Sequence, residues 1–377
     1  MPNTSLTDHI RPATSPATAS RQREPSTTIG SPGAGGGFDV VYAPLLLDFP
    51  ELVAELGGDP APLLQRVGIE PAELAGGSFN ATYRQLVNLL EIAATDLQSP
   101  DFGMRLARRQ QDSKEFGPLG TVMKCSTTFG DALDYVCSHN YVHSLAARVW
   151  LQQLTTERAV FVGHDILLDG LPNKSQVMEQ VMLIGHLTSM EMTGGRARAR
   201  RIHFRHQPVS PLRVYLKNFG CEVRFGQNED GVVYSMEDLA QPIIDPDSRA
   251  FEEMIAFIER HFTDRRPPMH AEVRGILMRL IGTADSSNER VARELNLHLR
   301  TLHRRLNTEG TSFQRIKDEV RRDAMVYYLR QTDLELARIS EKLGFAEQSV
   351  MARRCKRWFS ASPTQVRHQG PVVPESS

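Results

Sequence analysis

Residues 286–367 contain two copies of one pattern, in which a short helix, a tight turn and a second helix follow one another. The helices are expected at 289–296 and 299–307 in the first copy, and at 334–344 and 348–359 in the second. The small Ala292 and Ser340 occupy matching positions, where two helices must approach closely. Asn296 matches Gly344, and both residue types tolerate the positive φ of a tight turn. The repeat predicts an all-α helix-turn-helix module that can place two helices into successive stretches of one DNA major groove.

The segment 312–331 between the copies is expected to form one long helix. Its apolar stripe consists of Phe313, Ile316, Val320, Ala324 and Tyr327. At 1.5 Å a residue, about 18 residues span roughly 27 Å, which would separate the recognition helices by approximately one DNA turn. A rigid connector would then force the DNA to bend or leave one helix lightly engaged. The basic residues of this segment fit either phosphate contacts or solvated charges paired with neighbouring acids: Arg315, Lys317, Arg321 and Arg322.

Charge is distributed unevenly along the chain. Residues 271–368 hold 19 Lys and Arg against 12 Asp and Glu, a balance of about +7, whereas the whole chain has a net charge of −1. A basic C-terminal region predicts a polyanion, double-stranded DNA, as its partner. The four scattered cysteines fit buried thiols in a reducing compartment, and no apolar run is long enough to cross a membrane. We therefore expect a cytoplasmic protein.

Composition and periodicity divide the chain into five parts. The expected fold is a mixed α/β N-terminal domain plus an all-α C-terminal domain with two tandem helix-turn-helix motifs joined by a long helix. Tails at 1–38 and 370–377 have too few large apolar residues to fold, so we expect disorder there. The α/β domain is expected at 39–260, a basic Pro-Pro linker at 261–269 and the helical domain at 270–369.

The N-terminal region lacks the motifs of catalysis. It has no GxSxG, HExxH, P-loop or Cys/His pair in a catalytic context, so we expect no enzyme activity, no metal and no cofactor. The histidines of the 139–143 stretch are expected at a helix end, where they could line an effector site. The basic run 196–206 fits an edge strand with a charged outer face better than a nucleic-acid patch.

Several runs resemble the AraC/XylS family of bacterial transcription regulators. The similarity is carried by residues 295–321, with RTLHRRL and EGTSF, and by residues 339–367, with LGF and the KRWF and SPTQVR ending. The N-terminal part is similar to the arabinose-binding-type sensor domain of that family over roughly 45–250. The short motifs GPLG at 117–120, TTFGDA at 127–132 and NFGCEVRFG at 218–226 carry that similarity.

The resemblance implies which side chains read bases. On the first recognition helix Leu302 and Leu306 must face inward, which turns Arg300, His303 and Arg304 outward. On the second, Met351 and Cys355 face inward, and the outward residues are Gln348, Ser349, Ala352 and Arg353. Arginine can bond guanine O6 and N7 through two donors. The alternative is that these arginines bind phosphates or remain solvated.

The resemblance also implies partners. Family members of this layout are homodimers that read repeated half-sites, respond to a small-molecule effector and, when they activate, contact RNA polymerase. Two alternatives remain open from the residues alone. One is a metabolite-processing enzyme domain fused to a DNA-binding tail, and the other is a constitutive regulator without an effector. His298 and Glu347 replace the usual caps of the recognition helices, which could shift their first residues slightly.

Overall fold

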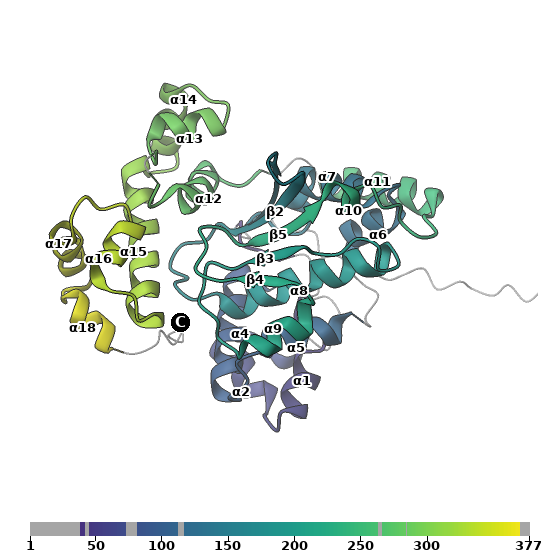
Figure 1. The fold of residues 1–377 in the computed structure, drawn as a ribbon, viewed down its shortest axis with the longest axis horizontal. Helices are drawn as coiled ribbons and strands as arrows, with labels where there is room; N and C mark the ends of the chain where they lie inside the picture. Colours follow the sequence, from purple (N-terminus) through teal and green to yellow (C-terminus); the bar gives the residue numbers. More distant parts are fainter. Residues whose placement is uncertain are drawn as a thin grey trace, which may run out of the picture.

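The computed structural model of the chain describes residues 38–41, 45–72, 81–111, 117–262, 266–283 and 285–369. It has a mixed α/β N-terminal part with a five-stranded sheet and an all-helical C-terminal part, which confirms the predicted fold class (Figure 1). Apart from Phe38, the two tails expected to be disordered lie outside the described residues.

The sheet has the strand order β1-β2-β5-β3-β4. Its strands are β1 (Ala147–Leu154), β2 (Ala159–Ile166), β3 (Arg201–His203), β4 (Glu222–Arg224) and β5 (Gly231–Ser235). Neighbours are antiparallel except β3 and β4, which pair in parallel. The edge-strand prediction for 196–206 is therefore wrong, because β4 covers the outer side of β3. The charges there are used internally: Arg200 pairs with Asp238 at 2.8 Å and Arg201 with Glu157 at 3.1 Å.

Helices surround this sheet. They are α1 (Phe49–Glu55), α2 (Pro60–Arg66), α4 (Tyr83–Asp96), α5 (Phe102–Gln110), α6 (Gly117–Cys125), α7 (Phe129–Ser138), the 3-10 helix η1 (Asn140–Val142), α8 (Ser175–Met192), α9 (Leu212–Phe219), α10 (Met236–Leu239) and α11 (Ser248–His261). Thr82 and Thr128 begin α4 and α7 with capping boxes, in which each side chain accepts from the backbone N–H three residues on. Helix α8 runs along one face of the sheet and contributes a long buried face to the main core (Figure 1).

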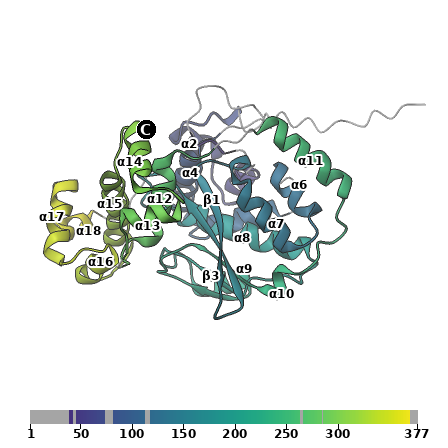
Figure 2. The same ribbon diagram turned by 90° about the horizontal axis from the view of Figure 1, so that it is seen from above.

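Helix α11 packs on α6, at the opposite end of the molecule from α16–α18 (Figure 2). Its contacts form a small separate core made of Leu119, Val122, Val142, Ile258 and Phe262. This core holds the last helix before the segment expected to be a linker against the N-terminal part.

The C-terminal part has two cores that share one long helix. Its helices are α12 (Met269–Leu280), α13 (Asn288–Glu294), α14 (Leu299–Thr308), α15 (Phe313–Gln331), α16 (Leu336–Lys342), α17 (Gln348–Phe359) and α18 (Pro363–His368). The first half of α15 buries Ile316 and Val320 with α12–α14, and the second half buries Met325 and Leu329 with α16–α18. The predicted single stripe is thus wrong for Tyr327, because the buried face of α15 rotates between the two cores.

The expectation of buried thiols holds for Cys355 alone. Cys125, Cys137 and Cys221 are half-buried, since each lies near the end of an element or on a helix flank. Partial burial still raises the pKa of Cys137 to about 12 and that of Cys221 to about 11. Within the described ranges, no helix is long and apolar enough to cross a membrane.

Candidate nucleic-acid interface and adjoining cavity

Helix α14 has one buried and one exposed face, as the sequence predicts. Leu302 and Leu306 are fully buried, whereas Arg300, His303 and Arg304 are exposed. Within the described part of the chain, the guanidinium groups of Arg300 and Arg304 have no ion-pair partner. The side-chain amide of Asn288, on α13, donates to Nε2 of His303 at 3.3 Å and orients the imidazole. Free donors on an exposed helix face suit contacts with an external partner.

Helix α17 repeats this arrangement. Met351 and Cys355 are fully buried, while Gln348, Ser349 and Arg353 are exposed, and Ala352 is half-buried. The hydroxyl of Ser349 donates to a carboxylate oxygen of Glu347 at 2.9 Å. All six predicted base-reading residues therefore lie on the exposed faces of two helices. That they contact bases stays a prediction.

The turns before these helices have the predicted conformation. Asn296 has φ 52° and Gly344 has φ 64°, the left-handed region that their residue types tolerate. Neither His298 nor Glu347 makes a side-chain cap, yet α14 and α17 begin at the expected Leu299 and Gln348. The weak caps therefore leave the helix starts unshifted, because Leu297 and Phe345, the partly buried apolar side chains of the two turns, pack against the cores and fix the register.

Helix α15 holds both units through polar contacts. The ammonium of Lys317 donates to the carbonyl of Ser286 at 2.6 Å. Arg321 donates to the carbonyls of Leu343 at 3.0 Å and Gly344 at 2.9 Å, and its guanidinium lies 4.8 Å from the ring centroid of Phe345. These two basic residues hold the module together. The other two form local ion pairs, Arg315–Glu319 and Arg322–Asp323.

Helix α12 is attached to the first unit at its N-terminus. The carboxylate of Glu309, at the end of α14, accepts from the backbone N–H groups of Met269 at 2.7 Å and His270 at 2.9 Å, and from the His270 ring at 2.7 Å. A carboxylate at a helix N-terminus satisfies free donors and complements the helix dipole. Sequence reasoning missed this contact because it joins residues far apart in the chain, with no local signal.

The other end of α12 docks on the outer face of the sheet (Figure 1). Arg279 donates to a carboxylate oxygen of Asp165, in β2, at 2.8 Å, and its guanidinium lies 4.7 Å from the ring centroid of Trp150. A Cβ on Gly275 would lie 2.6 Å from a methyl group of Leu167, so glycine permits the close approach. Leu167 belongs to the core of the first helix-turn-helix unit. The N-terminal and C-terminal parts therefore share buried contacts.

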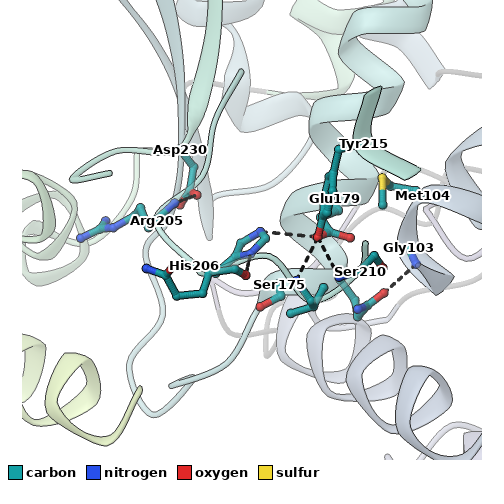
Figure 3. Close-up of polar contacts among 12 residues, drawn as sticks. Gly103, Met104, Ser175, Glu179, Arg205, His206, Ser210, Tyr215 and Asp230 are labelled. Carbon is teal, nitrogen blue, oxygen red and sulfur yellow. Dashed lines mark hydrogen bonds and ion pairs between the residues drawn. The ribbon is translucent and has the colours of Figure 1, made fainter. Parts of the chain in front are cut away.

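Helix α15 makes a second junction with the loop that follows β3. The hydroxyl of Tyr327 accepts from the backbone N–H of Gln207 at 2.7 Å. His206, the residue before Gln207, and Tyr215 of α9 both point at the fully buried Glu179 of α8 (Figure 3). Tyr215 donates to this carboxyl at 2.6 Å, and Nε2 of His206 lies 3.8 Å from it. Burial raises the pKa of Glu179 well above its ordinary value and lowers that of His206 to about 4.

A cavity of about 230 Å³ lies on the other face of the sheet, under α7 and α8. Its walls include Leu45, Gln110, Leu119, Met123, Phe129, Leu133, Asn140, His143, Val149, Val162, His164, Val181, Met182, Thr188, Val232 and Tyr234. Burial lowers the pKa of both histidines to about 4. Of the 139–143 stretch, Asn140 and His143 line this cavity, whereas the ring of His139 stacks on Tyr135. That the stretch contacts an effector stays a prediction. The rest of the lining had no sequence signal, because apolar wall residues look like ordinary core.

Neighbouring residues of β2 face the cavity and the helical module. Side chains alternate along a strand, so His164 lines the cavity while Asp165 reaches Arg279. In the portion of the chain that the structure describes, no group of His, Cys, Asp and Glu side chains could hold a metal ion.

Both parts of the chain match models of known protein families. A family model described as the arabinose-binding domain of AraC transcription regulators matches residues 57–243, and a helix-turn-helix domain model matches residues 291–369. The HTH-type transcriptional regulator VirS of Mycobacterium tuberculosis is 32% identical over 333 residues, which are 88% of this chain and 98% of that protein. The ornithine utilization regulator of Pseudomonas aeruginosa is 26% identical, over 87% of this chain and 95% of that protein.

Among solved structures, that of the transcriptional regulator CdpR from Pseudomonas aeruginosa aligns with 81% of this chain and 96% of its own, at 20% identity and a TM-score of 0.38. The family consists of transcription regulators and not enzymes, so the alternative of a metabolite-processing enzyme domain is set aside. The chain belongs to the AraC family of helix-turn-helix transcription regulators, with an arabinose-binding-type N-terminal domain.

Proposed function

We propose that this regulator reads its operator with the exposed faces of α14 and α17. The residues assigned to base contacts are Arg300, His303, Arg304, Gln348, Ser349 and Arg353. Their support is exposure on the two recognition helices and the lack of ion-pair partners for the three arginines in the described structure. We place the DNA-binding domain at 270–369, the linker at 261–269 and the sensing domain at 39–260.

We further propose that the N-terminal domain binds a small-molecule effector in the cavity under α7 and α8. One observation carries this proposal: consecutive residues of β2 face the cavity and the DNA-binding module. His164 lines the cavity, and Asp165 pairs with Arg279 of α12. A ligand that favours one position of this strand would thereby favour one presentation of the recognition helices. Because packed interfaces tend to switch between discrete arrangements, a small shift at the strand is sufficient.

We also propose that the full-length protein is a homodimer through its N-terminal domain, and that it contacts RNA polymerase if it acts as an activator. Two tethered DNA modules bind repeated half-sites more tightly than one, by a factor that linkage geometry can raise to about 100. Sedimentation and operator titration of the full-length protein and the 270–369 fragment test this. A monomeric full-length protein with fragment-like affinity would contradict the proposed role of the N-terminal domain.

The effector proposal is tested by screening full-length protein against small metabolites for thermal stabilisation, followed by operator titration with each stabilising compound. We expect at least one compound to change operator affinity by a factor of about 5–150, the usual range of coupling between sites. If stabilising compounds leave operator affinity unchanged, the constitutive regulator without an effector becomes the better reading.

A further inference from the structure

We infer that the cavity under α7 and α8 takes an uncharged, largely apolar molecule with one or two polar atoms, and not a sugar or a charged metabolite. This inference rests on the proposed function of the N-terminal domain as a sensor, and it names the class of effector. It differs from what the description of the matching family model, an arabinose-binding domain, would suggest.

The cavity has no charged wall. None of the described side chains lining it is a lysine, arginine, aspartate or glutamate. Its two histidines, His143 and His164, have pKa values of about 4, mainly because burial disfavours the charged imidazolium. The nearby ring of His164 lowers the pKa of His143 further, and the ammonium of Lys174 lowers that of His164. Both are therefore neutral at physiological pH. A carboxylate, phosphate or ammonium on a ligand would be buried here without a partner, which is strongly unfavourable.

Most polar wall groups are already engaged within the protein. The amide of Gln110 donates to the carbonyls of Leu45 at 3.0 Å and Leu47 at 2.9 Å. Asn140 donates to the carbonyl of Ser144 at 3.2 Å and accepts from the backbone of Val149 at 3.3 Å. These groups are not available to a ligand without breaking existing hydrogen bonds.

Two further polar wall groups are also engaged. The hydroxyl of Tyr234 donates to Ser189 at 3.2 Å. The ring of His164 shares a hydrogen bond of 3.3 Å with the hydroxyl of Tyr83. These bonds hold the rings in place at the cavity wall, and they reduce what the wall can offer a ligand.

Two polar side chains of the cavity wall have no hydrogen bond to any of the described residues. Among the described residues, the buried hydroxyl of Thr188 has no hydrogen-bond partner, although only 5% of the residue is exposed. The ring nitrogens of His143 likewise have no partner in that part of the chain, and a neutral imidazole offers one donor and one acceptor. A pentose carries several hydroxyl groups, and each one buried without a partner weakens binding. A largely apolar ligand with one or two polar atoms would match the Thr188 hydroxyl and the His143 ring.

The size of the cavity sets the scale of the ligand. An apolar protein cavity of about 150 Å³ stays dry and binds benzene. This cavity, at about 230 Å³, is larger and fits a fused bicyclic ring or an aliphatic chain of similar bulk. We expect one polar substituent of such a molecule to point towards Thr188 and His143.

The test uses full-length protein and three probes: 2-naphthol, 2-naphthoate and L-arabinose. Thermal shift and calorimetry should show that 2-naphthol binds and that L-arabinose does not. The affinity for 2-naphthoate should be lower than that for 2-naphthol by a factor of about a hundred or more. Thr188→Val keeps the volume and removes the free hydroxyl, so it should weaken 2-naphthol binding about tenfold. Thr121→Val, on α6 outside the cavity, should leave it unchanged. Val162→Phe fills the cavity and should abolish binding.

The outcomes separate the ligand class from the sensing function. The inferred ligand class would be overturned if L-arabinose or 2-naphthoate bound as tightly as 2-naphthol. It would also be overturned if Val162→Phe and Thr188→Val left 2-naphthol binding intact. If L-arabinose binds and changes operator affinity, the proposed sensing function is supported and the inferred ligand class is wrong. If neutral apolar probes bind with the expected sensitivity to Val162→Phe but no cavity ligand changes operator affinity, the inferred ligand class is supported and the proposed sensing function is wrong.

Discussion

Asp165 and Arg279 form an ion pair of 2.8 Å that joins the central sheet to α12, the first helix of the C-terminal part. Asp165 is almost fully buried, and the guanidinium of Arg279 also lies over the indole of Trp150. The residue before Asp165 lines the cavity on the opposite face of the same strand. Consecutive residues of β2 therefore contact the cavity and helix α12.

Asp165→Ala should therefore weaken the attachment of α12 to the sheet. A buried hydrogen bond to a charged group contributes about 1.5–3 kcal/mol, so the free energy of unfolding should fall by that amount. Urea titration followed by circular dichroism measures it. Asp134→Ala, an exposed acid on α7, should change the unfolding free energy by less than about 0.5 kcal/mol. Equal effects of the two substitutions would show that the pair does not hold the junction.

Base reading by α14 predicts a loss that depends on DNA sequence. Arg300→Ala or Arg304→Ala should cost about 1–3 kcal/mol at the operator and much less on random DNA. Arg305→Ala removes the same charge from the same helix, but its side chain lies nearer Glu272 of α12. It should weaken binding to both DNAs alike. Fluorescence anisotropy at two salt concentrations measures these losses, and uniform loss for all three variants would make them phosphate contacts.

Arg321 should matter for the second unit and little for the first. Its guanidinium holds the turn before α17 through the carbonyls of Leu343 and Gly344. Arg321→Met keeps the apolar stem but leaves these carbonyls without a partner, at a cost of about 1–3 kcal/mol. Hydrogen exchange should speed up in α16 and α17 and remain unchanged in α13 and α14. Faster exchange in both units would indicate that they unfold as one.

Gly185 and Gly130 offer a matched test of the cavity wall. A Cβ on Gly185, in the interior of α8, would meet no atom within 4 Å, whereas one on Gly130, in α7, would lie 3.1 Å from the carbonyl oxygen of Leu239. Gly185→Ala should raise the free energy of unfolding by about 0.5–1 kcal/mol, because alanine favours a helix interior. Gly130→Ala should give no gain. Thermal unfolding compares the two, and a loss at Gly185 would mean that the open space is not there.

The buried Glu179 predicts the pH dependence of stability. Its pKa is raised by burial, so the folded state holds this proton more tightly than the unfolded chain does. Stability from this group is present below the ordinary carboxyl pKa and is lost as pH rises above it. Glu179→Gln should flatten the fall in unfolding free energy as the pH rises above the ordinary carboxyl pKa, whereas Glu253→Gln, on the exposed face of α11, should not. Parallel curves for wild type and Glu179→Gln would contradict the assignment.

Local patterns in the sequence predict the recognition helices and their turns well. The inward Leu302 and Met351 and the positive φ of Asn296 and Gly344 follow from helical periodicity and residue type. Contacts between distant segments leave no such pattern. The pairing of β4 with β3, the rotation of the buried face along α15 and the Asp165–Arg279 pair depend on tertiary packing. The cavity could not be predicted from the sequence for the same reason, because its apolar lining residues have the same pattern as ordinary core residues.

The proposed coupling between the cavity and the operator is tested most directly by reciprocal titration. If a cavity ligand changes operator affinity by some factor, operator DNA must change the affinity for that ligand by the same factor. Calorimetric titration of the ligand into full-length protein, free and saturated with operator, measures this factor. We expect it to match the factor found by operator titration, and to move towards one in Asp165→Ala. A ligand that occupies the cavity with the same affinity in free and operator-bound protein would contradict the coupling.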